Sequence, residues 1–290
     1  MTFKLKRSFS LWSAKWRGWG GDMPSAHQHL ARIMKFDLER HSTQSLFQSP
    51  WSYHLPTLLL LDPGIDWPVT PAPNQRFVGP AVLRSPPRVQ HSEINGRYFS
   101  DGRAASRIYA GFGSLRRPPA AFISRLIEIA ERNPDWEILV AGNAAGHGQS
   151  DSPVNLRFVG WAPQLEALKL ADCAIFHGGT GTLNECLFTG TPMLIYPNAL
   201  DGKGNAARVV YHGLGHRGRY SDRTLKIERS ISKLLKAEDV HARLQLISKR
   251  LQSQRRNQAA VFAIRELLDA PPPVNPNQRL PGHAASEAQS

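Results

Sequence analysis

Cysteines and long apolar runs are nearly absent from this sequence. Only two of the 290 residues are cysteines, Cys173 and Cys186. Each lies in an apolar stretch without a CxxC partner, which argues against a disulfide framework and against a cysteine metal site. We therefore expect two buried, reduced thiols. The longest apolar run, residues 58–61, is strand-sized and far shorter than the roughly 20 residues of a membrane-spanning helix.

Acidic residues are also scarce. The chain has 23 Asp and Glu against 36 Lys and Arg, a formal net charge of +13. This excess favours a nucleic acid, an anionic membrane surface or a phosphorylated ligand as partner, with a solvated basic surface as the simplest alternative. Because no helix-turn-helix, zinc or RNP pattern accompanies the charge, we do not expect a nucleic-acid partner.

Part of the positive charge lies at the N-terminal end. Five Lys or Arg and three Trp occur in the first 21 residues, and no acid precedes Asp22. Lys15 interrupts the one candidate signal-peptide core, so we expect a cytoplasmic protein. Two interpretations of this segment stay open: an exposed extension, and peripheral contact with an anionic membrane.

The rest of the positive charge lies in the C-terminal part, which has a helical pattern. Residues 223–266 carry 11 Lys or Arg and four acids. The apolar periodicity predicts one buried stripe opposite a basic face: Leu244, Ile247, Leu251, Val261, Ile264 and Leu268. The proline-rich residues 271–290 are typical of a disordered tail.

The middle of the chain alternates short apolar runs with amphipathic segments. The runs predict strands at 107–112, 137–142, 156–160, 173–177 and 192–197. The other segments predict helices at 119–132, 163–171, 181–189 and 202–212. This alternation indicates an α/β fold, a Rossmann-like parallel sheet with helices on both faces. Ligands of such sheets bind at the carboxyl ends of the strands, so the residues after each strand are candidates for a site.

The strongest candidate is the segment FHGGTGTLNE, residues 176–185. A predicted strand ends at His177, and three glycines follow where a helix begins: Gly178, Gly179 and Gly181. Free backbone N–H groups and the helix dipole favour an anion there, and two threonines and the imidazole add donors. The spacing matches neither the dinucleotide fingerprint nor the P-loop. We interpret the segment as a phosphate site, with tight packing alone as the alternative.

Three other strand ends carry candidate binding groups. GFGSL, residues 111–115, places a hydroxyl at a glycine turn, although ordinary turn chemistry explains it equally well. Trp161 follows the strand at 156–160 and offers an indole that stacks on a base, or a core residue that caps the sheet. Asp201 follows the last predicted strand and offers a carboxylate to adjacent sugar hydroxyls, or an N-cap to the next helix.

The order of these motifs resembles the donor-binding box of the UDP-glycosyltransferase superfamily. WAPQ, HGGTGTLNE, GTPMLIYP and DGKGN follow one another within residues 107–215, and the bacterial macrolide glycosyltransferases share the HGGxGT form. More weakly, the resemblance reaches back through DPGIDWP and RFVGP. It implies the C-terminal donor domain of a GT-B glycosyltransferase, in which two Rossmann-like domains face each other across a cleft.

The resemblance implies roles residue by residue. Trp161 would stack on the base with Gln164 beside it, and Glu185 would hold the ribose hydroxyls. Asp201 would hold the donor sugar, and Asn205 falls at the family's DQxxN position. The diphosphate contacts would come from the glycine turns and the helix start: Ser114, His177, Gly178, Gly179, Gly181 and Thr182. Backbone dipoles and the imidazole would stabilise the leaving diphosphate, and we expect neither a metal nor a cofactor besides the nucleotide-sugar co-substrate.

Two positions depart from the family pattern. Gly202 stands where the family usually has Gln after the sugar-contacting Asp, so one sugar contact is lost. The family's general base is a His early in the N-terminal domain, and none of the early histidines has that setting: His27, His29, His41 and His54. The catalytic base is therefore not identified in this chain.

These patterns divide the chain into four parts. Residues 1–80 would be a partial, acceptor-side N-terminal region that includes a buried strand at 57–61. Residues 81–106, polar and broken by Pro and Gly, would be a linker, 107–270 the donor-binding domain and 271–290 the tail.

The motifs leave two classes of function open. As an enzyme, the chain would transfer a hexose-type sugar from a nucleoside-diphosphate sugar, a UDP-sugar, to an unidentified acceptor with inversion. It would then work with a separate acceptor-domain subunit or as a homo-oligomer. As a non-enzyme, it would be a nucleotide-sugar binding module or a defective, truncated glycosyltransferase.

Overall fold

A computed structural model describes residues 56–68, 70–71, 74–80, 82, 99, 106–113, 117–142, 152–197, 201–254 and 259–269. The predictions for residues 1–55, for most of the linker at 81–106, for Ser114 and for the tail at 271–290 lie outside these ranges. Apart from Pro56, Thr57 and Asn74, the described residues belong to one compact unit.

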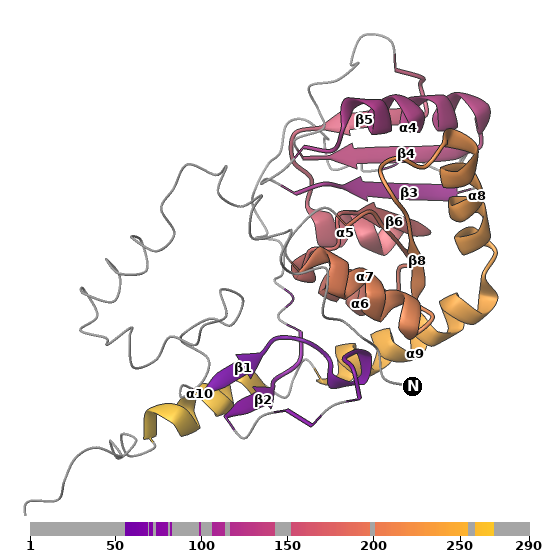
Figure 1. Ribbon diagram of the computed structural model, residues 1–290. Helices are drawn as coiled ribbons and strands as arrows, with labels where there is room; N and C mark the ends of the chain where they lie inside the picture. Colours follow the sequence, from indigo (N-terminus) through magenta and orange to yellow (C-terminus); the bar gives the residue numbers. More distant parts are fainter. Residues whose placement is uncertain are drawn as a thin grey trace, which may run out of the picture. The chain divides into compact units, whose positions relative to one another are not determined.

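A six-stranded sheet forms the centre of this unit, with every pair of neighbouring strands parallel (Figure 1). Its order is β5-β4-β3-β6-β7-β8. The strands are β3 (Ser106–Gly111), β4 (Trp136–Ala141), β5 (Leu156–Val159), β6 (Cys173–Phe176), β7 (Met193–Ile195) and β8 (Gly215–Arg217). The predicted Rossmann-like parallel sheet is confirmed. Only β8 was not predicted, because its three residues carry no apolar run.

Helices follow the strands in the predicted order. They are α4 (Ala120–Arg132), α5 (Gln164–Leu170), α6 (Thr180–Thr189), α7 (Gly202–Tyr211), α8 (Thr224–Leu235), α9 (Glu238–Gln254) and α10 (Ala259–Asp269). The predicted bounds of the first four agree within one residue. Among the described helices, none is long and apolar enough to cross a membrane.

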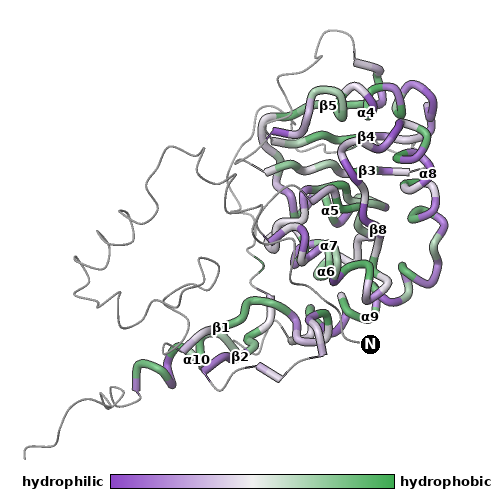
Figure 2. The backbone as a smooth tube through the Cα atoms, in the orientation of Figure 1, coloured by the Kyte–Doolittle hydropathy of each residue, from purple (hydrophilic) through white to green (hydrophobic). Residues whose placement is uncertain are grey.

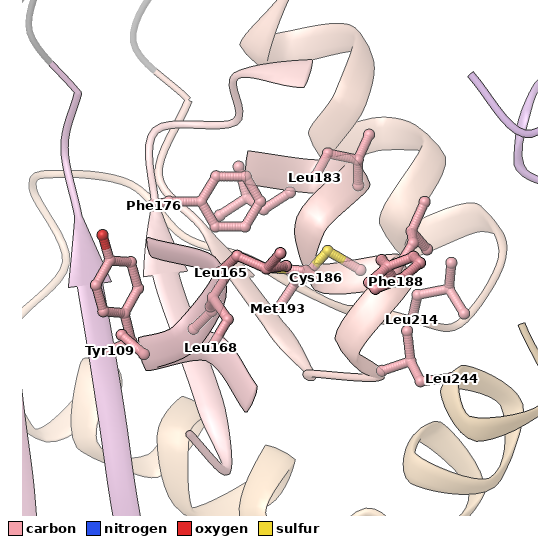
Figure 3. Packing of buried hydrophobic residues seen from close by; sticks show 14 of the residues in the cluster. Tyr109, Leu165, Leu168, Phe176, Leu183, Cys186, Phe188, Met193, Leu214 and Leu244 are labelled. Carbon is pink, nitrogen blue, oxygen red and sulfur yellow. The ribbon is translucent and has the colours of Figure 1, made fainter. Parts of the chain in front are cut away.

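The sheet is covered on both faces, so it has two separate cores. One contains Phe122 of α4 and Ile227 of α8, packed with Ile108 of β3. The other contains residues of α5, α6 and α7, such as Leu165 and Leu183. Figure 3 shows side chains of the second core meeting between the helices and the sheet. Strands β6 and β7 are buried along their whole length and β4 along most of it, so their residues are almost all apolar, and Figure 2 shows this hydrophobic colouring in β4.

Both cysteines lie in these cores. Cys173 and Cys186 are buried and unpaired, as predicted. Burial raises the pKa of the Cys173 thiol to about 12, with a smaller effect from the Asp172 carboxylate. Both thiols therefore stay protonated at neutral pH, which makes them packing groups rather than nucleophiles.

The predicted apolar stripe in the C-terminal helices is half right. Leu244 and Leu251 of α9 are buried, and α9 packs against α6. In α10, however, Val261, Ile264 and Leu268 are exposed by 42%, 47% and 78%, and the buried residue is Ala263. Periodicity predicts an apolar face but not what covers it, and the prediction of a buried stripe in α10 is wrong for these three residues.

Residues 57–68 contain a short strand and a turn that is anchored on the helices. Residues Thr57–Leu59 form β1, which pairs with β2 (Gln75–Phe77), but β1 is only half-buried, so the prediction of a buried strand is wrong in that respect. After it, the buried Asp62 accepts two hydrogen bonds from Arg250, at 2.9 and 2.8 Å. Asp66 pairs with Arg208 at 2.7 Å. These contacts fix the turn-rich residues 62–68 against α7 and α9.

Candidate functional site

The predicted site motifs meet at one edge of the sheet. Because all strand pairs are parallel, the carboxyl ends of β3, β5, β6 and β7 lie at the same edge. In the order of the sheet, this edge carries the loop with Trp161 after β5, the turn after β3, the glycine turn after β6 and the start of α7. Ser114 belongs to the first of these turns but lies outside the described residues.

His177 sits among glycines at the end of β6. A Cβ at Gly113 would lie 3.0 Å from its Cε1 atom, and one at Gly179 only 2.8 Å from its Nε2 atom. Gly113 also has a φ of +66°, which L side chains rarely adopt. The glycines of these turns therefore leave the room that the imidazole ring occupies.

The His177 ring is poorly solvated and incompletely hydrogen-bonded. Its Nδ1 atom is buried and has no hydrogen-bond partner among the described residues. Burial lowers the pKa of this imidazole, and the opposing effects of the Asp201 carboxylate and the Gly111 backbone are smaller. The ring is therefore neutral at neutral pH, and one of its nitrogens carries a hydrogen that it can donate.

The start of α6 leaves backbone N–H groups without partners. Its N-cap is Gly179, which has no side chain to cap the helix. Leu183 is the first residue whose N–H reaches the Gly179 carbonyl, at 3.0 Å, and the N–H of Gly181 donates to none of the described residues. A Cβ at Gly181 would meet nothing within 4 Å, so the space beside it is open. Orphan donors and the helix dipole favour an anion there.

Asp201 and Asn205 close this helix start from the side of α7. The Asp201 Oδ2 atom accepts hydrogen bonds from the Thr180 N–H at 2.9 Å and from its hydroxyl at 2.6 Å. Asn205 donates to the Gly178 carbonyl at 2.8 Å and to the Thr180 hydroxyl at 3.0 Å. Asp201 occupies the N-cap position of α7 but makes no cap hydrogen bond, so its carboxylate serves the site instead.

A second polar group joins β3, α5 and α6. Gln164 donates to the Thr182 hydroxyl at 3.0 Å and to the Glu185 carboxylate, and it accepts from the Tyr109 hydroxyl at 3.0 Å. Burial raises the pKa of Glu185, and the hydrogen bond from Gln164 opposes this shift. Tyr109 was not predicted as part of the site. The signal in the sequence was a tyrosine inside an apolar strand, since a buried hydroxyl needs a partner.

Trp161 lies in the loop between β5 and α5, 44% exposed. A core residue that caps the sheet would be buried, so the exposure favours an indole available to a ligand. The next polar residue along the loop is Gln164, which begins α5. The indole is therefore near the Gln164–Glu185 pair in the chain, at the β5 side of the edge.

The structure thus brings the predicted residues together in two clusters. One contains Gln164, Thr182 and Glu185; the other contains Gly178, Asp201 and Asn205. Helix α6 joins them, because Thr180 and Glu185 both belong to it. Within the described ranges, no three His, Cys, Asp or Glu side chains are placed to hold a metal ion.

Known proteins similar in sequence share this region. Residues 126–264 match the family model described as the erythromycin biosynthesis protein CIII-like, C-terminal domain. A zeaxanthin glucosyltransferase of Pantoea ananas is 28% identical over 186 residues, which cover 63% of this chain and 43% of that protein. An oleandomycin glycosyltransferase of Streptomyces antibioticus is 25% identical over 60% of this chain and 40% of its own. The matching part of the chain thus spans less than half of either relative.

Solved structures give the same result. The glycotransferase of kitacinnamycin matches with a TM-score of 0.57 and 26% identity, over 66% of this chain and 49% of its own. The calicheamicin glycosyltransferase matches with a TM-score of 0.59 over 93% of this chain and 67% of its own. At 20% identity, this second likeness shows the fold alone.

Proposed function

We propose, on the premise that residues 126–264 belong to the EryCIII-like C-terminal domain family, that this chain binds a nucleoside-diphosphate sugar as the donor half of a glycosyltransferase. The donor would be a UDP-sugar, and the reaction the transfer of its hexosyl group to an acceptor with inversion. Curated relatives named as glucosyltransferases and glycosyltransferases support the reaction class.

The observation that carries this proposal is the order of groups along the carboxyl edge. An exposed indole is followed by the Gln164–Glu185 pair, then by the open start of α6, and then by the Asp201 carboxylate. A nucleoside-diphosphate sugar presents a base, two ribose hydroxyls, two phosphates and a sugar in the same order. Stacking, carboxylate hydrogen bonds, helix-dipole stabilisation and a second carboxylate fit these four parts in turn.

In the proposed reaction, the chain's own groups act on the leaving diphosphate. The bond from the anomeric carbon to the diphosphate oxygen breaks, and negative charge grows on that oxygen. The N–H of Gly181 and the His177 imidazole would donate to that oxygen, and the chain holds both before the reaction begins, the one at the start of α6 and the other packed among glycines. Donors held in place in this way stabilise developing charge more effectively than water, which must reorient.

The Asp201 carboxylate has one oxygen engaged and one available. Its Oδ2 atom already accepts from Thr180 and Asn205, which orients the group. The Oδ1 atom would accept from a sugar hydroxyl. Gly202 supplies no further sugar contact, so we propose that recognition of the sugar rests more on Asp201 than in relatives with Gln at this position.

A binding module without turnover is the second candidate, because no base that would deprotonate the acceptor is identified among the site residues. Purified protein titrated with UDP in a calorimeter tests both candidates, with His177→Ala as the site variant. We expect micromolar binding that the variant weakens; no UDP binding, or unchanged binding in the variant, would contradict the proposed site.

Release of UDP from UDP-sugars then separates the two candidates. Turnover, alone or with a candidate acceptor-domain partner, supports the enzyme. Tight UDP binding without turnover under both conditions supports the binding module.

A further inference from the structure

The last strand of the sheet ends in a basic hollow outside the donor site. Arg217, Gly218, Arg219 and Lys226 line a space of about 360 Å³. The first two lie at the carboxyl end of β8, and Lys226 belongs to the first turn of α8. These four residues, here called the basic hollow, have no part in the site described above.

The basic hollow lies at the same edge of the sheet as the candidate donor site. Arg217 is paired in register with Ile195 of β7, and the Gly218 N–H donates to the Ile195 carbonyl at 2.8 Å. A Cβ at Gly218 would lie 2.3 Å from Cε1 of Tyr196. The main chain therefore packs directly on this buried ring, which leaves the two arginine side chains facing away from the core.

One acid lies among these cations, and its hydrogen bonds are already used. Asp222 accepts from Lys226 Nζ at 2.6 Å and from the Arg219 N–H at 2.8 Å. Burial alone would raise the pKa of Asp222, but these two hydrogen bonds and the nearby charges lower it below the usual value. The carboxylate is therefore ionised and neutralises Lys226.

The guanidinium groups of Arg217 and Arg219 remain. Neither forms an ion pair with an acid in the described part of the chain, and Arg217 is exposed. The basic hollow together with Asp222 thus carries an excess of two positive charges. At its side, α8 begins at Thr224, and its N-cap residue Arg223 makes no side-chain cap hydrogen bond, so the positive end of the helix dipole adds to this charge.

We propose that the basic hollow binds the phosphoryl group of a small phosphorylated ligand. A phosphomonoester dianion balances the excess of two charges, whereas a single carboxylate balances half of it. The planar fork of each guanidinium matches a pair of phosphate oxygens, and such charge-assisted pairs are the strong ones. The space of about 360 Å³ holds a phosphoryl group together with part of the molecule that bears it.

The test is a calorimetric titration of the full chain with inorganic phosphate and with glycerol 3-phosphate. Arg217→Gln combined with Arg219→Gln removes the proposed ligands and leaves the Arg219 N–H bond to Asp222 intact. The control combines Arg229→Gln and Lys236→Gln, which remove the same charge from exposed sites at and just after α8. Thermal unfolding of both variants confirms that they fold.

We expect the arginine double variant to bind phosphate about tenfold more weakly than the wild-type chain. The control double variant should bind it less than about twofold more weakly, because its charges act through solvent. Equal weakening by the two pairs would overturn the proposal in favour of diffuse charge. No binding of either phosphate to the wild-type chain would also overturn it.

Two further arms separate this inference from the proposed donor site and from a lipid headgroup. UDP affinity should be unchanged in the arginine double variant, and phosphate affinity unchanged in His177→Ala. Phosphate binding that is lost only in His177→Ala would place phosphate in the donor site and overturn the inference. Sedimentation with phosphatidylcholine vesicles carrying phosphatidic acid, in the absence of binding to soluble phosphates, would also overturn it.

Discussion

Asp201 and Thr180 are joined by two hydrogen bonds, one from the Thr180 N–H and one from its hydroxyl, at 2.9 and 2.6 Å. The two residues lie on different helices, so these bonds tie the start of α7 to the start of α6. They also give one of the orphan N–H groups of α6 a carboxylate as its acceptor. The remaining orphan donors are thereby left for a ligand, and the carboxylate is held at the edge of the open space.

Replacement of this carboxylate should affect the sugar more than the nucleotide. In Asp201→Asn we expect the affinity for a UDP-hexose to fall about tenfold, the value of one hydrogen bond to a charged group. The affinity for UDP should change by less than about twofold, because the diphosphate contacts remain. Calorimetry with both ligands measures the difference.

A matched control for this variant lies at the opposite end of the sheet. The Asp172 carboxylate also accepts a backbone N–H, that of Arg107, at 2.8 Å. Asp172→Asn should leave both affinities unchanged. Equal losses for UDP and UDP-hexose in Asp201→Asn would contradict a sugar-binding role.

Two exposed tryptophans should separate binding from stability. In Trp161→Ala we expect UDP affinity to fall by about 1–3 kcal/mol, the usual range for base stacking on an aromatic ring. Thermal stability should change little, because the side chain is 44% exposed. In Trp67→Ala we expect the opposite result, a loss of thermal stability with little change in UDP affinity. The Trp67 ring contacts Tyr211, with centroids 5.2 Å apart, and the Arg208 guanidinium lies over it. Unchanged UDP affinity in the first variant would return Trp161 to a packing role.

The sequence was sufficient for the order of the elements because helices and strands depend on local patterns. Strand bounds, helix bounds and the glycine turn after β6 all follow from short windows of residues. The partners of the polar side chains do not. Gln164 meets Tyr109 and Glu185, which are 55 and 21 residues away, and only the parallel register places them together. For the same reason, the sequence did not predict that Asp201 would bond Thr180 instead of capping its own helix.

His177 should make the protein less stable in weak acid. Burial lowers the pKa of this imidazole in the folded state, so the unfolded chain binds the proton more tightly. The free energy of unfolding should therefore fall as the pH drops below the unfolded pKa of about 6.5, and level off below the folded pKa. In His177→Asn this part of the pH dependence should disappear.

The measurement is thermal unfolding of both proteins between neutral and weakly acidic pH. His216 is a second histidine whose pKa is lowered, by burial and by Lys233, so it contributes to the pH dependence in the same direction. His216→Asn is therefore the control, in which the contribution of His177 should remain. If the stability of His177→Asn falls as steeply with decreasing pH as that of the parent, the imidazole of the parent is well solvated and the prediction is wrong.

A carboxylate introduced at position 164, next to that of Glu185, should make the free energy of unfolding rise as the pH falls. In Gln164→Glu the new group lies against Glu185, whose pKa burial already raises. Two carboxyl groups at this distance cannot both be ionised at low cost, so the pKa of the pair in the folded state rises further. We expect a loss of about 1–3 kcal/mol at pH 8 that is largely recovered once the pH falls through this raised pKa.

Gln164→Met serves as the uncharged control for that experiment. It removes the hydrogen bonds that Gln164 donates to Thr182 and Glu185, and also the one that it accepts from the buried Tyr109 hydroxyl at 3.0 Å, which a glutamate could still accept. Its loss of stability should therefore be similar at about pH 8 and below the raised pKa of the carboxyl pair. A Gln164→Glu variant without pH dependence would mean that the two carboxylates move apart.

Gly202 should not tolerate the glutamine that the superfamily usually has at this position. An ideal Cβ there would lie 2.6 Å from the carbonyl oxygen of His177, a backbone atom that cannot yield without moving the glycine turn. Gly178 faces it from the other side, with a φ of +91° and its own ideal Cβ position 2.8 Å from Gly202 Cα. The close approach of these two glycines holds the end of β6 against the start of α7.

We therefore expect Gly202→Gln to lower the free energy of unfolding by about 1–3 kcal/mol, the range for overpacking, and to weaken UDP binding as well. Gly204→Gln is the matched control, because it lies in the same helix and a Cβ there meets only the flexible Arg208 side chain, at 3.2 Å. Removing a helix-interior glycine should leave that variant as stable as the parent or more so. Chemical unfolding of the two variants decides the matter: equal stability would mean that the turn after β6 can move, and that glutamine is absent for a reason other than space.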